Sequence, residues 1–463
     1  MSFPGPILPI LGPVLVAGVA LLLGRWPRAR TIAGVTGSFI IAGWIAALSL
    51  DSGSDIGPGL FAGDTWLLLG RPFVLTESVQ SLFVFLWIGL GILFLLALLF
   101  PQDPAFVPAA LAAFSPLAAA FMVELFSIGA VFLTIAVAMI VMSYKPQQFK
   151  NPYGALRYLL IFTLSLPLLL LVGWLFESQQ ATFFSTLVVR VLALAVALLL
   201  AGFPFYIWVY PLVAEAPLLF PALIFGLMQT AVISFLLSFL WTHPWLQHDP
   251  QFLLWLRWSG AGTVLVASVL ILTAVKWRFL MAHLLLLNMG MSLLALTLPA
   301  PEVWEVSLMT HLARFVSLLL AGMAMCLLER QLQSPIIADS RGLGRQNPLG
   351  FVLLVYSFFS LVGTPLTPGF FPQWAIIAGI GHQANVWLAV LLVLALTISV
   401  YAVLRVLIVP FGDRDNQEQL SEVKYSRWMQ GLIVLLLILA VSLALLPQPL
   451  LTATSSLTGI SNG

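Results

Sequence analysis

Apolar runs of about 20 residues recur from one end of this sequence to the other, each long enough to cross the ~30 Å hydrocarbon core of a bilayer. Only 8% of the residues are charged, whereas a soluble globular domain carries about 25%. Because backbone polar groups inside a bilayer must be satisfied within the chain, these runs predict helices. The sequence therefore predicts an all-α, multi-pass integral membrane protein without a sizeable soluble domain.

The spacing of the apolar runs predicts about fourteen transmembrane helices. The segment from Pro101 to Ser143 is nearly continuous, so it must fold back near Glu124 to form two of them. The first run, Ile7–Gly24, lacks the basic residues that precede a signal peptide core, and we interpret it as a retained helix. The expected helix centres lie near residues 15, 41, 90, 114, 134, 166, 194, 229, 264, 288, 317, 357, 396 and 438.

The basic residues indicate the orientation of the chain. When each loop is numbered by the helix that it follows, all but four of the 19 Lys and Arg residues lie in or beside odd-numbered loops. Positive loops stay on the cytoplasmic side, so both termini are expected on the opposite side. Topology alone explains most of these residues, but Arg314 lies inside a span. The other exceptions are Arg71, Arg190 and Arg257.

Two apolar segments contain several prolines. The first, FPFYIWVYPLVAEAP, covers Phe203–Pro217, and the second, GTPLTPGFFPQW, covers Gly363–Trp374. Proline removes a backbone donor and interrupts a helix, so we expect breaks at Pro204, Pro365 and Pro368. In lipid such breaks persist only where protein or a water-filled cavity surrounds them. The two segments therefore predict a path or a joint at membrane depth.

Few features of the sequence point to chemistry on this chain alone. The single cysteine, Cys326, lies in an apolar run and can form neither an internal disulfide nor a cysteine metal cluster. We find no glycine-rich dinucleotide loop and no set of thiolates for an iron–sulfur cluster. No cofactor, no metal and no nucleic acid partner is therefore expected, and no catalytic residue is proposed.

Six segments stand out in a fixed order along the chain: GALRYLLIFTLS (154–165), FPFYIWVYPLVAEAP (203–217), WRFLMAHLLLLNMGMSLLAL (277–296), THLARFVSLLLAG (310–322), GTPLTPGFFPQW (363–374) and SVYAVLRVL (399–407). They carry a resemblance to the antiporter-like membrane subunits of respiratory complex I (NDH-1) and of Mrp-type cation/proton antiporters. The sequence resembles a divergent member of this family over roughly residues 70–410, and the quinone-proximal complex I subunit is the most similar type.

The resemblance implies a specific architecture. The family fold has fourteen helices, two inverted five-helix repeats, and breaks in helices 7 and 12. Applied to this sequence, it places helices 1–3 in residues 1–105, the first repeat in 106–245, the second repeat in 250–410 and the last helix in 411–463.

The resemblance also implies a function, with alternatives. The first is an antiporter-like membrane-arm subunit of a complex I-type NAD(P)H:quinone oxidoreductase, associated with proton translocation. The second is a subunit of an Mrp-type Na⁺/H⁺ antiporter or a related ion-coupled complex. The third is a non-conducting structural paralogue that scaffolds such a complex. Each implies other membrane subunits and lipid as partners, in a bacterial inner (plasma) membrane or a thylakoid membrane.

The sequence departs from the family at its ionisable positions. Buried charged groups normally mark an ion path through a membrane protein. The family register places Leu133 and Leu199 where a glutamate and a lysine are usual, Gln229 where lysine or histidine is usual, and Gln373 where lysine is usual. Glutamine can bind a water chain but carries no net charge, so packing and a water-wire role both remain open for Gln229.

His311 and Arg314 are the strongest remaining candidates for a proton path. They are three residues apart and share a helix face. Arginine stays protonated, so Arg314 is better suited to anchoring an anion or a carboxylate than to relaying protons. A histidine satisfied within the core is the alternative for His311. His283 is a further candidate, and we expect it to face Asn288 across slightly more than one turn.

Two carboxylates complete the candidate residues. Glu124 is expected to open a helix, where an acid interacts favourably with the helix dipole, or else to be a displaced member of the proton path. Glu215 follows the first broken segment in VAEAP, and both a loop-capping role and a conducting role are open for it.

Overall fold

Each expected helix centre falls within a helix of the computed structural model, which describes residues 3–50, 60–63, 65–68, 70–142, 144, 153–329, 331, 334–383, 385–412 and 427–445. In these residues nine helices are long and apolar enough to cross a bilayer, and five shorter apolar helices accompany them. The chain is thus an essentially all-helical membrane protein. Five of the basic residues used for the orientation, Lys145, Lys150, Arg330, Arg414 and Lys424, lie outside the described residues.

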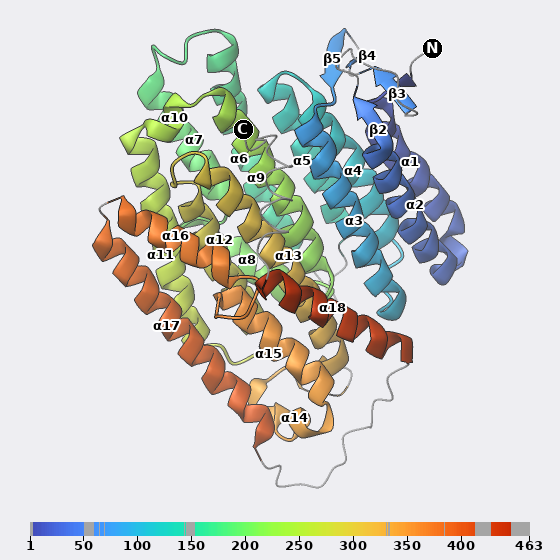
Figure 1. The fold of residues 1–463 in the computed structure, drawn as a ribbon, viewed down its shortest axis with the longest axis vertical. Helices are drawn as coiled ribbons and strands as arrows, with labels where there is room; N and C mark the ends of the chain where they lie inside the picture. Colours follow the sequence, from blue (N-terminus) through green and yellow to red (C-terminus); the bar gives the residue numbers. More distant parts are fainter. Residues whose placement is uncertain are drawn as a thin grey trace.

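The first helices stand at one edge of the bundle (Figure 1). α2 begins with a proline at its first position, where the missing N–H costs nothing. α3 is capped by Thr76, whose hydroxyl accepts the Val79 N–H at 3.4 Å. The elements of this part are α1 (Ile7–Leu22), η1 (Leu23–Arg25), α2 (Pro27–Ala47) and α3 (Glu77–Leu99).

Short strands cover the end of this group, a feature that the all-α prediction lacked. Gly70, with a φ of +74°, lies in the turn of a two-stranded antiparallel hairpin, where a positive φ is typical. The other three strands form a small parallel sheet in the order β1-β3-β2. The strands are β1 (Phe3–Pro4), β2 (Leu48–Leu50), β3 (Leu60–Gly63), β4 (Thr65–Leu68) and β5 (Arg71–Val74).

The middle of the chain contains the first broken helix. The chain reverses between α4 and α5 at Glu124, as expected, and the seventh helix is interrupted after Leu199. A π-helical turn, η3, leads directly into α9. The elements are α4 (Phe106–Met122), α5 (Phe126–Met142), α6 (Tyr153–Glu177), α7 (Ser185–Leu199), η2 (Phe205–Trp208), α8 (Val209–Glu215), η3 (Ala222–Met228) and α9 (Gln229–Thr242).

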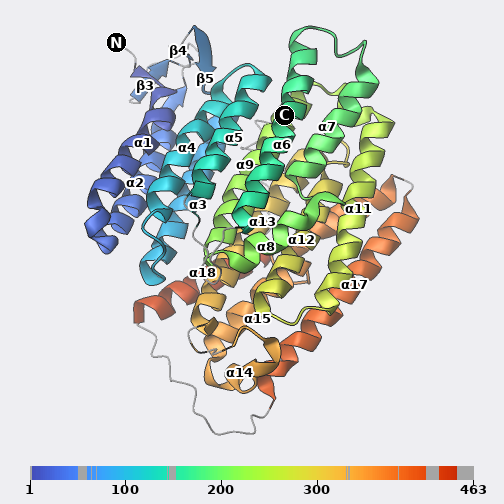
Figure 2. The same ribbon diagram turned by 180° about the vertical axis from the view of Figure 1, so that it is seen from behind.

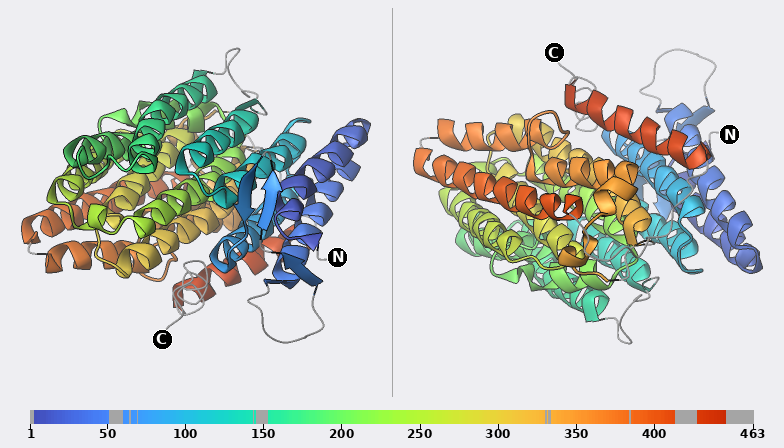
Figure 3. Two further views of the ribbon diagram at one scale, coloured as in Figure 1. Left: turned by 90° about the horizontal axis from the view of Figure 1, so that it is seen from above. Right: turned by 90° about the horizontal axis from the view of Figure 1, so that it is seen from below.

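The last part contains the second broken helix, in which α15 and α16 are separated at Gly363–Gly369. Figure 3 shows α18 crossing the bundle obliquely. The elements are α10 (Trp245–His248), α11 (Pro250–Leu272), α12 (Trp277–Ala295), α13 (Glu302–Glu329), η4 (Ile337–Ser340), α14 (Leu343–Gln346), α15 (Pro348–Val362), α16 (Phe370–His382), α17 (Val386–Ile408), η5 (Val409–Phe411) and α18 (Arg427–Leu445).

α12 and α13 form the centre of the bundle. In the apolar stretch of each, 94% of the residues are buried, compared with 28% for α17, which stands at the edge opposite α1 and α2. Viewed from behind, α8 lies beside α12, so the first broken segment reaches the centre (Figure 2). Polar side chains on α12 and α13 are therefore held away from lipid, where they need partners within the protein.

Candidate functional site

A neighbouring helix satisfies the backbone of the first break. α7 ends at Leu199, and Pro204 has no amide hydrogen with which to continue the ladder. Thr263 of α11 accepts the Phe203 N–H at 2.7 Å, and the Ser259 hydroxyl donates to the Phe203 carbonyl at 3.1 Å. Because the Phe203 N–H bonds to α11, it is not available to the Leu199 carbonyl four residues earlier. The break is thus supported from α11, and the Leu199 carbonyl has no partner in its own helix.

The second break frees a carbonyl for a different reason. α15 ends at Val362, and Gly363 follows in the left-handed region with a φ of +82°, which glycine adopts without strain. In a continuous helix the Leu361 carbonyl would accept from the residue four positions later. That residue is Pro365, which has no N–H, so the sequence itself removes the partner.

Three buried side-chain amides bind the carbonyls that the breaks set free. Gln229 Nε2 donates to the Leu199 carbonyl at 3.0 Å. Gln373 Nε2 donates to the Leu361 carbonyl at 3.0 Å, and Asn288 Nδ2 donates to the same carbonyl at 3.3 Å. The three amides are at most 3% exposed. Since an unpaired carbonyl in a membrane interior is costly, these residues stabilise the two breaks.

Arg314 lies next to this group and is 1% exposed. Its Nη2 donates to the Asn288 backbone carbonyl at 2.9 Å and to the Ser292 hydroxyl, and its Nε donates to the Asn288 side-chain oxygen. Its Nη1 lies 3.3 Å from the Met289 sulfur. All these partners are neutral, and no carboxylate in the described part of the chain pairs with Arg314. The guanidinium therefore places a fixed positive charge in the centre of the bundle.

His311 lies one turn from Arg314 and is fully buried. Its Nδ1 is 2.8 Å from the Ser307 carbonyl, which makes Nδ1 the protonated nitrogen in the neutral ring. Its Nε2 and the Ser307 hydroxyl have no hydrogen-bond partner among the described residues. A buried polar atom of this kind usually binds water, so His311 retains hydrogen-bonding capacity that Arg314 has used.

A pair of serines links α13 to the second break. The Ser317 and Ser360 hydroxyls are 2.6 Å apart, and the Ser360 hydroxyl also accepts the Gly369 N–H at 3.4 Å. Arg314 and the amides form one hydrogen-bonded group, and the serine pair forms a second group beside it, because Ser360 precedes Leu361 in the chain. We call the two groups together the polar axis, which joins α12, α13, α15 and α16. The axis consists of Ser292, Arg314, Asn288, the Leu361 carbonyl, Gln373, Ser317 and Ser360.

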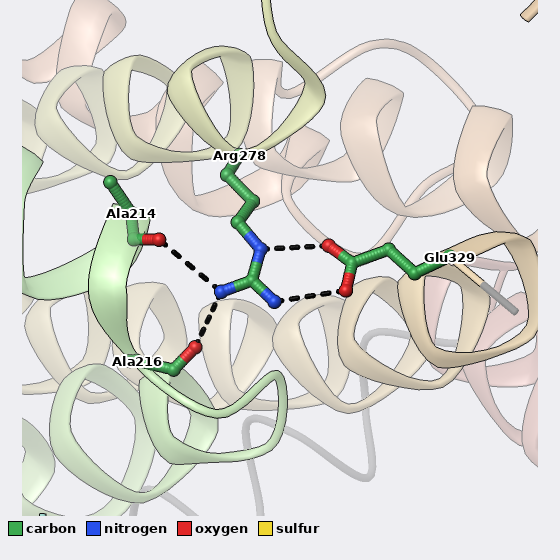
Figure 4. Close-up of polar contacts among 4 residues, drawn as sticks. All are labelled: Ala214, Ala216, Arg278 and Glu329. Carbon is green, nitrogen blue, oxygen red and sulfur yellow. Dashed lines mark hydrogen bonds and ion pairs between the residues drawn. The ribbon is translucent and has the colours of Figure 1, made fainter. Parts of the chain in front are cut away.

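An ion pair lies at the C-terminal end of the first broken segment. Arg278, at the start of α12, binds both carboxylate oxygens of Glu329 at 2.7 and 2.9 Å (Figure 4). The Arg278 Nη1 donates to the Ala216 carbonyl at 2.6 Å and the Ala214 carbonyl at 3.2 Å. These carbonyls belong to the C-terminus of α8, where a cation interacts favourably with the helix dipole. Arg278 thus ties α8 to both α12 and α13.

Glu215 lies in the same region, between the two alanines. It is 8% exposed and accepts the Gly154 N–H at 2.8 Å, in the first turn of α6. A carboxylate at that end of a helix is electrostatically favourable. Tyr144 lies nearby, and burial together with the Glu215 carboxylate raises the pKa of its phenol. The observed contact of Glu215 is therefore a helix cap.

The chain as a whole is similar to proteins of known family and fold. A family model described as "NADH:quinone oxidoreductase/Mrp antiporter, TM" matches residues 77–399. The chain belongs to this family. NADH-quinone oxidoreductase subunit N of Hydrogenovibrio crunogenus is 24% identical over 265 residues, which are 56% of this chain and 54% of that protein. The matched part thus spans about half the length of that relative.

Two solved structures share the antiporter-like fold over nearly the whole chain. One is a chain of respiratory complex I from Thermus thermophilus with bound NADH, with a TM-score of 0.76, 21% identity, and coverage of 99% of this chain and 100% of that chain. The other is a chain of the Mrp complex from a Dietzia species, with a TM-score of 0.76, 14% identity, and coverage of 98% and 97%. At these identities the likeness concerns the fold.

The four neutral residues at which the resemblance predicts titratable groups are buried in the structure. Leu133 and Leu199 are at most 1% exposed, and so are Gln229 and Gln373. The side chains of the two leucines make apolar contacts, whereas the side chains of the two glutamines donate to carbonyls that the breaks set free. Gln229 Oε1 and Gln373 Oε1 have no partner among the described residues, so each amide keeps one free acceptor.

The structure does not bring the other candidates into this axis. His283 stacks on Tyr210 of α8, with ring centroids 5.9 Å apart, so the expectation that it faces Asn288 is wrong. Five residues along a helix turn the side chain by about 500°, which leaves the two about 140° apart. Glu124 is exposed in the α4–α5 turn. The carboxylate that accepts from the first turn of α5 is instead Glu177, 3.4 Å from the Ser127 nitrogen.

Sequence reasoning missed several residues of the site. Arg278 had been explained by topology, and Glu329, Ser259, Thr263 and Ser360 were not singled out. Leu361 lies four residues before Pro365, and this spacing could have indicated from the sequence that the Leu361 carbonyl lacks a helical donor. Within the described residues, no three His, Cys, Asp or Glu side chains gather as a metal site would require.

Proposed function

We propose that this chain is an antiporter-like membrane-arm subunit of a complex I-type NAD(P)H:quinone oxidoreductase. The relatives named NADH-quinone oxidoreductase subunit N and the fold shared with complex I support this assignment. The chain would carry out this function only as part of the whole complex, because electron transfer would take place in other subunits. Membership of an Mrp-type antiporter is the second candidate, supported by the fold shared with the Mrp complex. Co-purification separates them, since only the first predicts flavin and iron–sulfur subunits.

Within the complex, the polar axis and the Gln229–Leu199 contact together form a hydrogen-bonded joint with a fixed charge. The observation that carries this proposal is that Gln229, Gln373 and Asn288 bond to carbonyls freed by the breaks, while Arg314 bonds to neutral groups. A relay needs a group that gains and loses a proton, and a guanidinium does not. The axis would hold the broken helices in register next to conducting neighbours.

Proton relay through this chain remains the competing function, because His311 Nε2 is buried without a partner. The test is proton uptake by proteoliposomes of the whole complex with His311→Gln, which keeps a polar group in place. Exposed His248→Gln on α10 is the matched control. Unchanged uptake is expected for a joint. A loss of uptake of at least about tenfold with intact assembly and electron transfer would establish a relay and refute the joint.

The finer architecture is part of the same proposal. We place helices 1–3 in residues 1–105, the first inverted repeat in 106–245, the second in 250–410 and the last helix in 411–463, with about fourteen crossings. Both termini would lie on the non-cytoplasmic side, of a bacterial inner or a thylakoid membrane. In a Cys326→Ala background, Ser178→Cys should react with an impermeant reagent only from the non-cytoplasmic side, and Ala338→Cys only from the cytoplasmic side. The reverse pattern would invert the orientation.

A further inference from the structure

A groove opens on the outer surface of the bundle beside the first helix break. Its volume is about 350 Å³, within the range of small-molecule pockets of roughly 300–1,000 Å³. Its walls come from α6, η2, α8, α11 and α12, and are mostly apolar. The residues that carry the argument are Arg157, Ile207, Tyr210, Leu270, His283 and Leu286.

Cations stand at the end of the groove where α6 and α12 begin. Arg157 is exposed in the second turn of α6 and forms no ion pair with any described residue. Lys276 precedes α12, and its Nζ lies 5.1 Å from the centre of the Phe279 ring, which in turn contacts Tyr210 at 4.5 Å. Glu215 is also at this end, but it is buried and does not line the groove. The mouth of the groove is therefore electropositive.

The groove extends from this charged end into the apolar depth of the bundle. His283 lies six residues after the start of α12, or about 9 Å deeper, and Leu286 lies deeper still. His283 is 8% exposed and lines the groove, and its Nδ1 has no hydrogen-bond partner in the described part of the chain. One buried polar atom thus lies between a cationic mouth and an apolar interior.

The segment beside the groove is more exposed than an interrupted helix in lipid should be. Phe203 is 45% exposed, Ile207 is 65% exposed and Tyr210 is 39% exposed. Irregular backbone at membrane depth is tolerated only where it is covered. A molecule with an anionic head and an apolar chain matches the sequence of charge, polar atom and apolar wall along this groove.

We propose that the groove binds an anionic phospholipid. Its phosphate would lie at Arg157, a glycerol ester oxygen would lie near His283, and one acyl chain would pack along Ile207, Leu270 and Leu286. Basic pockets between transmembrane helices are known to select such head groups. The second acyl chain would stay in the bilayer. The bound chain covers the segment that follows the first break and restrains it.

The test is native mass spectrometry of the purified full chain with added phosphatidylglycerol or phosphatidylcholine. The wild-type chain should retain phosphatidylglycerol preferentially. Arg157→Gln should weaken that retention about fivefold, as expected for one basic group at a membrane surface. Arg190→Gln, which removes an equally exposed arginine from α7, should leave it unchanged. Leu270→Trp should fill the apolar part of the groove and reduce lipid retention. Leu265→Trp, on the same helix but outside the groove, should leave retention unchanged.

Two results would overturn the proposal. One is equal retention of the two lipids, or equal loss in the Arg157 and Arg190 variants, because the groove would then have no head-group selectivity. The other comes from a photo-crosslinking amino acid at Ile207 in native membranes. Crosslinks to lipid support the proposal, and crosslinks to a second protein would show that this face is a subunit interface.

Discussion

The side-chain amide of Gln229 lies 3.0 Å from the backbone carbonyl of Leu199, so a buried polar residue and a helix break form one unit. The sequence resemblance predicts titratable residues at these two positions, and here the pair is neutral. Gln229 still presents a polar side chain, but its Nε2 donates to the backbone carbonyl of Leu199. The hydrogen bond between Gln229 and Leu199 should therefore affect the free energy of unfolding of the chain and not its affinity for protons.

Replacing Gln229 with methionine should lower the free energy of unfolding by about 1–3 kcal/mol, because the Leu199 carbonyl would be buried without a donor. Thermal unfolding of the detergent-solubilised chain measures the change. Gln251→Met, at an exposed position in the first turn of α11, should stay within about 0.5 kcal/mol of wild type. Equal effects for the two variants would mean that the amide bond contributes nothing specific.

Thr263→Val should destabilise the first break by about 0.5–1.5 kcal/mol, because the Phe203 N–H loses the Thr263 hydroxyl at 2.7 Å and keeps only the longer contact to the Ser259 carbonyl at 3.4 Å. Valine keeps the shape of threonine, so packing changes little. Thr397 is the control, since it is exposed on α17 and its hydroxyl bonds only to Val393 of its own helix. Limited proteolysis near Phe203 provides a second measurement, and unchanged protection in Thr263→Val would contradict the assigned role.

The pair formed by Arg278 and Glu329 should show energetic coupling. Arg278→Met and Glu329→Gln are each expected to destabilise the chain, and the double variant should lose about 1–2 kcal/mol less than the sum. Arg278→Met should be the more harmful, because it also removes the donor to the Ala214 and Ala216 carbonyls. Strict additivity in this double-mutant cycle would show that the two side chains act independently.

Gly363→Ala should destabilise the second break by about 1–2 kcal/mol. The glycine has a φ of +82°, and a Cβ at this position would collide with the Gln373 side chain. Gly18→Ala is the matched control, because nothing lies within 4 Å of its Cβ position and alanine favours a helix. That variant should be neutral or slightly stabilising. A harmless Gly363→Ala would show that the turn tolerates another backbone conformation.

The sequence predicted the breaks well, because proline acts locally. Pro204 and Pro365 remove hydrogen-bond donors whatever surrounds them, and the helices do end a few residues before each. The hydroxyls that support the first break could not be assigned in the same way. A Ser or Thr inside a helix usually bonds to its own helix, and Thr263 also does so with Ser259. Only the packing of α11 against the break reveals the second contact.

The charged residues were harder to interpret. Arg278 obeys the pattern of basic loops, so topology alone could explain it, yet its guanidinium donates to the Glu329 carboxylate and to the Ala214 and Ala216 carbonyls. Ion pairs between residues 51 positions apart depend on tertiary packing and leave no local pattern. His311 and Arg314 were found because both lie within one apolar helix, where any ionisable group stands out.

The Leu361 carbonyl accepts from Asn288 on α12 and from Gln373 on α16, and Asn288 in turn holds Arg314. A carbonyl oxygen has two lone pairs, and both are occupied here. If α16 pivots about the Gly363–Gly369 turn, the Gln373 side chain must detach from this oxygen or pull the oxygen with it. Either movement alters the hydrogen bonds of Asn288, which accepts from the Arg314 guanidinium. Hinge motion of this half-helix is therefore coupled to the position of a permanent charge.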